Sequence, residues 1–250
     1  MYFTISTQLQ VVLAIVLFYL YDAALLLKPE EGLLSPLRSG WRAQLASQGF
    51  ELRRNRLLWL PIFALHQPAY RLHWSTTQIR LPGEAALSTA LERHSRSFKA
   101  FALPLYLLAA LLFLGLPAAL LVLHSERLQL IALALIYWST AWLSWLTLRH
   151  GRQGHSSEAF ARSTALQILL CPPFALNVVR KLALSHETQA DLLQAAQALM
   201  GASQWKALAA QVQQQMQREM DEIAELPEYA PTLAQMQQSL SELAQNSARS

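Results

Sequence analysis

The chain has 250 residues and a net charge of +4; 53% of its residues are hydrophobic and only 14% are charged, against roughly 25% charged in ordinary globular proteins. The deficit of charge is concentrated in three long apolar runs, so we expect a mainly α-helical membrane protein rather than a soluble domain. The single cysteine, Cys171, excludes an intrachain disulfide and a cysteine-built metal site. Arginine outnumbers lysine and Ala and Leu are abundant, which is typical of a GC-rich bacterial genome.

Residues 9–27 form the first apolar run, and only Asp22 interrupts it. No basic residue precedes the run and no small-x-small cleavage site follows a short apolar core, so we interpret residues 1–27 as a retained N-terminal transmembrane helix. A carboxylate inside an apolar span costs about 2.5–3.5 kcal/mol on insertion scales, which makes Asp22 a possible intramembrane polar site. A proton or ion role, a structural polar contact and a position at the interface all remain open for it.

Residues 28–99 are too long for a simple connector, and we interpret them as a small cytoplasmic α+β insert with a basic charge. Ser35 and Pro36 fit the N-cap and first position of a helix. The apolar residues that follow at helical spacing are Leu37, Trp41 and Leu45. A helix is therefore predicted to run from this point to Gly49, a plausible residue just past its C-terminus.

Strand patterns follow within the same insert. Residues 50–61 contain two short strand-like runs around a polar turn, and residues 69–74 alternate between apolar and polar side chains with a period of two. Residues 83–99 have the pattern of an amphipathic helix that leads into the next apolar run. The basic charge of the insert is explained by its position beside the membrane, so we do not expect it to bind nucleic acid.

Residues 100–148 are predicted to form a transmembrane helical hairpin. The two uncharged runs, 100–123 and 128–148, are each long enough to cross a hydrocarbon core of roughly 30 Å at about 1.5 Å per residue. Only four polar residues separate them, which requires antiparallel neighbours. Pro117 lies inside the first of these runs and is expected to kink it.

The distribution of basic residues predicts the orientation. None of the 20 lies before the first run, most lie in residues 28–99 or after residue 148, and the short link between the second and third runs holds only Arg127. Three spans with the N-terminus outside and the C-terminus inside satisfy this pattern. We therefore expect a multi-pass protein of the bacterial inner membrane with most of its non-membrane mass in the cytoplasm.

Residues 149–185 contain the unusual stretch "LLCPPFALNVVRKL" (169–182), which is too short to cross a bilayer. We interpret 165–184 as a proline-broken helical element at the membrane interface or packed beneath the spans; a core helix of a soluble domain is the alternative. Its apolar stripe is expected to face lipid or the bundle, while its two cations reach lipid headgroups. The candidate contacts are Phe174, Val178 and Leu182, with Arg180 and Lys181 as the cations.

Residues 186–250 are acidic and rich in Gln, and they are predicted to form three cytoplasmic helices. The last helix carries apolar residues at 3-4-3 spacing, which we consider a candidate surface for partner docking. These residues are Leu233, Met236, Leu240 and Leu243. A self-contained helical hairpin, in which such stripes pack on one another, is an equally good interpretation.

The sequence contains no nucleotide-binding glycine loop, no nucleophile elbow and no H-E-x-x-H or C-x-x-C motif. The histidines have no acidic or cysteine ligand at fixed spacing, so we expect no metal and no cofactor, and we interpret them as surface residues near the headgroups.

The leading hypothesis for function is a non-catalytic membrane subunit, scaffold or assembly factor. Its expected partners are membrane lipids and other subunits or further copies of itself. An oligomeric channel or transporter subunit is one alternative. The other is an interface enzyme acting on lipid or lipid-linked sugar.

Overall fold

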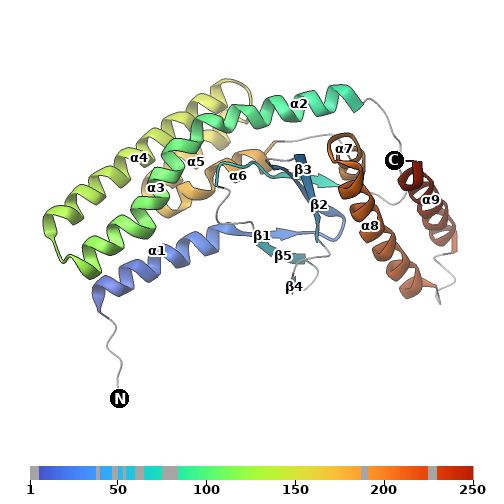
Figure 1. The fold of residues 1–250 in the computed structure, drawn as a ribbon, viewed down its shortest axis with the longest axis horizontal. Coiled ribbons are helices and arrows are strands. Elements are labelled where there is room, and N and C mark those ends of the chain that lie inside the picture. The colour runs from blue at the N-terminus through green and yellow to red at the C-terminus, as the bar shows by residue number, and fades with distance from the viewer. Residues whose placement is uncertain are drawn as a thin grey trace, which may run out of the picture. The chain divides into compact units, whose positions relative to one another are not determined.

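Figure 1 shows the computed structural model, which is mostly helical and divides into two compact units. Unit 1 comprises Met1–Leu25, Trp59–Pro68 and His94–Glu187, and unit 2 comprises Leu26–Leu58, Ala69–Arg93 and Thr188–Ser250. The structure describes residues 6–37, 40–46, 50–52, 55–59, 65–74, 84–186, 191–224 and 230–249. The prediction of a mainly helical chain is confirmed.

Unit 1 begins with helix α1 (Thr7–Ala23), whose N-terminus is capped by the Ser6 hydroxyl accepting a hydrogen bond from the Leu9 amide. The chain then leaves the helix, and Ala24–Leu27 form strand β1. The helix, 17 residues long, therefore ends at Ala23 and does not extend over the last residues of the run 9–27. Two other helical stretches, Ser88–Val122 and Glu126–Arg152, are long and apolar enough to cross a membrane, a test of length and composition that some soluble and signal helices also pass.

The second apolar run is a continuous but irregular helical segment. After helix α2 (Glu84–Ser97) come a 3-10 turn η2 (Phe98–Phe101), helix α3 (Ala102–Ala110), and two π-helical turns, η3 (Leu111–Gly115) and η4 (Ala118–Val122). Pro117 lies between the two π-turns. Proline has no N–H to donate and its ring crowds the preceding turn, so the wider hydrogen-bonding pattern develops beside it.

Helix α4 (Glu126–Arg152) starts at a Ser125 cap, and helix α5 (Glu158–Leu170) starts at a Ser157 cap; a glutamate follows each serine and favours the first turn. Helices α4 and α5 pack closely against each other. Pro172 then begins a 3-10 turn, η5 (Pro172–Asn177), which leads into helix α6 (Val178–Leu184). The proline-broken helical element predicted here is present.

Unit 2 contains short antiparallel strands. Strands β2 (Glu31–Leu37), β3 (Gly40–Leu45) and β6 (Tyr70–His73) form a sheet in the order β3-β2-β6. A second sheet has the order β1-β5-β4, with β4 at Phe50–Leu52 and β5 at Asn55–Trp59. The strands predicted within 50–61 and 69–74 are confirmed, and β6 shows the expected alternation of buried and exposed residues.

The helix predicted after Ser35 is wrong, because these residues form the β2–β3 hairpin instead. Pro36 pairs with Trp41, and Gly40 has a φ of +136°, which favours glycine near the turn. Trp41 and Leu45 are both buried in β3. A spacing of four residues places side chains on one face in a strand as well as in a helix, so the pattern did not distinguish the two periods.

The tail helices complete unit 2. Helix α7 (Leu192–Leu199), capped by Asp191, packs on β2 and β3, while α8 (Ala202–Ile223) and α9 (Ala230–Arg249) form a helical pair. The acidic tail and the basic insert therefore belong to one compact unit. The apolar stripes of α8 and α9 are buried at Trp205, Leu208, Val212, Met216, Met220, Met236 and Leu243.

The close packing of α4 on α5 depends on Gly151. A Cβ atom at this position would lie 2.6 Å from the Cβ of Ala161, which no side-chain rotation can relieve. We expect Gly151→Ala to lower the free energy of unfolding by about 1–3 kcal/mol, measured by tryptophan fluorescence in detergent micelles. Gly115→Ala is the matched control, since its Cβ would make only ordinary contacts, at 3.6 Å and beyond. Equal destabilisation by both variants would contradict this account.

Candidate functional site

Two polar clusters lie within the otherwise apolar unit 1. The first, the Asp22 network, links α1 to η5 and α6 through Asp22, Asn177, Arg180 and Lys181. The second, the histidine cluster, consists of His94, His150, His155 and His186. Burying a polar group costs free energy unless the group is paired or neutral. We therefore consider these two clusters the candidate functional sites of unit 1.

The Asp22 network is built around one carboxylate. The Lys181 Nζ lies 2.6 Å from Asp22 Oδ1, and the Asn177 Nδ2 donates a hydrogen bond to Asp22 Oδ2 at 3.1 Å. Arg180 Nη1 donates in turn to Asn177 Oδ1 at 3.1 Å. The side chains of Asp22 and Lys181 are only 10% and 22% exposed, so the ion pair is largely removed from solvent.

The local sequence explains why these groups meet. Residues 177, 180 and 181 are separated by three and four positions, which places them on one side of the helical segment that starts at Pro172. Aromatic contacts hold this segment against α1: Phe18 and Phe174 make an edge-to-face contact at 6.1 Å between ring centroids. Lys181 also lies 4.9 Å above the Phe174 ring, so its cation is stabilised on two sides.

These contacts show where the residues expected to contact the membrane lie within unit 1. Val178 and Leu182 are fully buried within unit 1 and Arg180 is 4% exposed, so these three side chains do not face lipid. Lys181 points to Asp22 rather than to headgroups. The element packs against α1, α4 and α5 of unit 1, and its position relative to a membrane stays a prediction. An inward carboxylate at position 22 gives the cation a partner that a lipid interface would not provide.

Burial also changes the acid–base properties of nearby groups. It lowers the pKa of the Arg180 guanidinium from its ordinary value, an effect that the neighbouring Tyr19 hydroxyl partly offsets. Burial raises the pKa of the Cys171 thiol, which keeps it protonated at neutral pH. Since the thiolate is the nucleophilic form, Cys171 does not have the environment of a reactive cysteine.

The histidine cluster gathers residues from four separate segments. His94 comes from α2, His150 from the last turn of α4, His155 from the turn before α5, and His186 from the end of α6. The ring centroids of His94 and His186 are 4.0 Å apart, and those of His150 and His155 are 4.9 Å apart. His94 is 5.5 Å from His150 and 5.6 Å from His155, so the four rings form one contiguous group.

This cluster overturns the expectation of scattered surface histidines. His94 and His150 are only 5% and 3% exposed, and the Phe98 ring lies 4.8 Å from that of His150. No local sequence motif predicts this cluster, because most of its members are distant from one another in sequence. The one signal was the recurrence of His150 and His155 beside the end of an apolar run, which has no specific meaning by itself.

Burial favours the neutral form of His94, His150 and His186. The cluster lies outside the predicted spans 100–123 and 128–148. Burial, together with the fields of the other three histidines, lowers the pKa of His94 to about 3. Burial and the fields of His155 and His186 lower the pKa of His150 to about 4. The pKa of His186 is lowered as well, chiefly by burial. At neutral pH the His94 and His150 rings are therefore uncharged.

Metal binding is the first function to consider for such a group. Within the described part of the chain, no set of three or more His, Cys, Asp or Glu side chains is arranged to hold a metal ion. The His94 and His186 rings instead lie 4.0 Å apart and are tilted by 39°. Four imidazoles in mutual contact form a group in which a proton on one ring affects the others.

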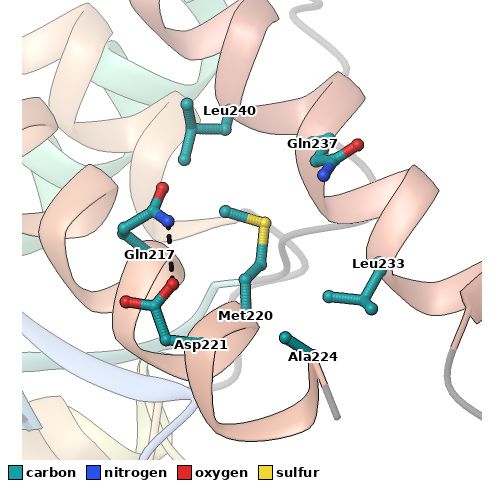
Figure 2. Close-up of a pocket in the computed structure, with 7 residues that line it drawn as sticks. All are labelled: Gln217, Met220, Asp221, Ala224, Leu233, Gln237 and Leu240. Carbon is teal, nitrogen blue, oxygen red and sulfur yellow. Dashed lines mark hydrogen bonds between the residues drawn. The ribbon is translucent and has the colours of Figure 1, made fainter. Parts of the chain in front are cut away.

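The proposed docking stripe of α9 divides into two pairs. Met236 and Leu243 are buried within unit 2, whereas Leu233 and Leu240 line a groove of about 270 Å³ between α8 and α9. Figure 2 shows this groove. Its other lining residues are Gln217, Met220, Asp221, Ala224 and Gln237, and Gln217 donates a hydrogen bond to Asp221 at 3.0 Å.

Comparison with known proteins adds no assignment to this geometry. Neither the scan against protein-family models nor the searches of curated proteins and of solved structures gave a match. The function is therefore argued from the two clusters of unit 1, from the surface of its helices and from the groove of unit 2.

The Asp22–Lys181 pair predicts a strongly non-additive response to mutation. Asp22→Asn leaves the Lys181 cation without its counter-charge, and Lys181→Met leaves the carboxylate without its cation. Each should lower the free energy of unfolding by about 3 kcal/mol, as breaking a mostly buried pair does. The double variant should recover part of this loss, by about 1–2 kcal/mol, in a double-mutant cycle measured by chemical denaturation in micelles.

Additive losses would show that the two charges do not interact. The control is the exposed pair Glu158–Arg162, which has a comparable separation of 2.8 Å but side chains 59% and 73% exposed. Its removal should cost less than about 1 kcal/mol.

Proposed function

We propose that this chain is a multi-pass membrane protein that acts as a non-catalytic subunit, scaffold or assembly factor of a larger membrane complex. The observation that carries the proposal is the inverted surface of unit 1, where large apolar side chains point outward while the charges of the Asp22 network are buried inside. The most exposed of these apolar residues include Leu17, Leu103, Leu114, Leu130, Trp138 and Leu170, each at least 64% exposed.

The physical argument is the size of this exposed surface. Single apolar residues on a protein surface are normal, but contiguous apolar surface on several neighbouring helices indicates lipid or a partner. The exposed residues belong to α1, α3, η3, α4 and α5, which pack with one another or with η5. A hydrocarbon environment satisfies such a surface, and helices satisfy their backbone hydrogen bonds within it.

Three spans remain our proposal for the topology. The helical stretches that include 100–123 and 128–148 have the length to cross. Helix α1 has 17 residues, a length of about 26 Å, which a thinned bilayer can accommodate. The excess of basic residues after the first run supports an external N-terminus and a cytoplasmic unit 2, in a bacterial inner membrane.

Partner docking is proposed for the groove between α8 and α9. Its apolar floor at Met220, Leu233 and Leu240, bordered by amides and a carboxylate, suits the apolar face of an amphipathic helix from another subunit. A second copy of this chain is the other occupant to be tested. Leu233 and Leu240 line this groove and can contact a docked helix, whereas Met236 and Leu243 are buried within unit 2.

The two alternative functions receive less support from the geometry. A channel or transporter subunit needs polar groups that are available to a permeating species, whereas the buried Asp22 and Lys181 side chains already neutralise each other. An interface enzyme needs an activated nucleophile or a general base next to substrate, and the protonated Cys171 thiol is not such a nucleophile.

The topology can be tested by labelling single cysteines in a Cys171→Ser background. We expect a cysteine at position 8 to react with an impermeant maleimide from the periplasmic side, and one at position 238 to react only after the inner membrane is opened. Labelling of position 238 in intact spheroplasts, or of position 8 only from the cytoplasm, would refute the proposed orientation.

Docking can be tested with charge substitutions on the two faces of α9. Leu240→Glu places a carboxylate in the groove and should reduce recovery of co-purifying subunits at least tenfold. Ala234→Glu adds the same charge on an exposed face of the same helix and should leave recovery unchanged. Both variants should retain wild-type helix content by circular dichroism. Equal recovery with both variants would remove the groove from the proposed function, and a recovered band of the chain itself would assign the groove to self-association.

A further inference from the structure

The histidine cluster occupies a special place in the connectivity of the chain. The longest continuous segment of unit 1 is His94–Glu187, so His94 is its first residue and His186 is its last but one. The chain enters this segment from α2 and leaves it towards the tail helices. The 4.0 Å contact between the His94 and His186 rings therefore joins the entry and the exit of the segment.

The other two histidines attach this junction to the body of unit 1. His150 belongs to the last turn of α4, and Phe98 and Phe101 lie 4.8 and 6.1 Å from its ring. His155 is 4.9 Å from His150 and 5.6 Å from His94. The buried Nε2 of His150 has no hydrogen-bond partner within the described part of the chain, which leaves a lone pair or an N–H unsatisfied at the centre of the contact.

Among the described residues, the histidines of the cluster act on one another's pKa values. The pKa of His94 is lowered by the charges of the other three histidines, and that of His150 by His155 and His186. The pKa of His186 is lowered by the charge of His155, whose backbone is also hydrogen-bonded to the His186 side chain. On the adjoining helix α5, Glu158 is exposed and engaged with Arg162. Each proton that one imidazole accepts therefore disfavours the charge on the next.

We propose that the histidine cluster is a proton-operated latch. When its imidazoles are neutral, the packed rings hold the entry and exit of the His94–Glu187 segment together against the end of α4. When two or more become protonated, like charges at ring separations of 4.0 to 5.6 Å repel, and the His186 end of the segment is released.

The direction of the pH dependence follows from linkage. An unfolded or released histidine has a pKa near 6.5, whereas the pKa values in the closed cluster are about 3 for His94 and about 4 for His150. The released state thus binds more protons than the closed state between these values. The stability of the closed latch is full above pH 6.5 and is lost as the pH falls from 6.5 towards 4.

The test measures the distance across the latch in the full chain. Spin labels are placed at Gln153→Cys and Ser185→Cys in a Cys171→Ser background, in lipid nanodiscs, and the label-to-label distance is measured by double electron–electron resonance at a series of pH values. We expect one narrow distribution at pH 7.5 and a longer, broader one at pH 4.5. The transition should involve about two protons, because the histidines titrate together.

Substitutions of the histidines test whether the pH transition arises from the cluster. His155→Gln removes one repelling neighbour, so its midpoint should move to lower pH. His94→Gln with His150→Gln should abolish the transition, and His124→Gln, outside the cluster, should leave it unchanged. A distance independent of pH, or an unchanged transition in the double variant, would overturn the proposal. Tight one-to-one binding of Zn²⁺ at pH 7.5 that requires His94 and His150 would also overturn it, because the cluster would then be a metal site.

Discussion

The structure of unit 1 depends on the requirement that a carboxylate placed among apolar helices find its counter-charge within the same chain. Asp22 lies near the end of α1, and Lys181 on α6 meets it at 2.6 Å. This pairing decides how α6 must be oriented, and the break at Pro172 gives the chain the turn that makes that orientation possible. The apolar stripe of the same segment is then left to pack against the other helices, where Val178 and Leu182 are fully buried.

Such a pair contributes more to specificity than to net stability. Removing two charges from solvent costs nearly as much as their attraction returns, so a hydrophobic pair of the same volume would often be as stable. The buried amide of Asn177, which bridges Asp22 and Arg180, nevertheless allows only one register of η5 against α1. A bundle whose outer surface is apolar has little else to fix that register, because Leu and Ala contacts tolerate sliding.

The two polar clusters satisfy the same low-dielectric constraint in different ways. The Asp22 network pairs opposite charges, Asp22 with Lys181, whereas burial favours the uncharged form of His94 and His150. The second solution depends on pH below about 6.5, because a released imidazole has its ordinary pKa near that value. A rigid element and a titratable one thus occur in the same helical unit.

Several elements could be predicted because their signals are local. Serine caps followed by glutamate define the start of α5, the paired prolines end it, and the alternation of Tyr70, Arg71 and Leu72 defines β6. The apolar runs are equally local, since the length of an uncharged stretch is a property of the sequence alone. The groove between α8 and α9 was partly foreseeable, because its apolar stripe was visible but the division between buried and exposed members was not.

The sequence by itself therefore determined the helical runs, their caps and the presence of one isolated carboxylate in an apolar run. Only the tertiary structure decided that Glu31–Leu37 and Gly40–Leu45 pair as antiparallel strands, since residues four apart share a face in both a strand and a helix. It alone turned Lys181 towards Asp22, 159 positions away along the chain, and gathered four histidines from four segments. Contacts of this range depend on which surfaces pack together, and that choice is made by the burial of the whole chain rather than by any local pattern.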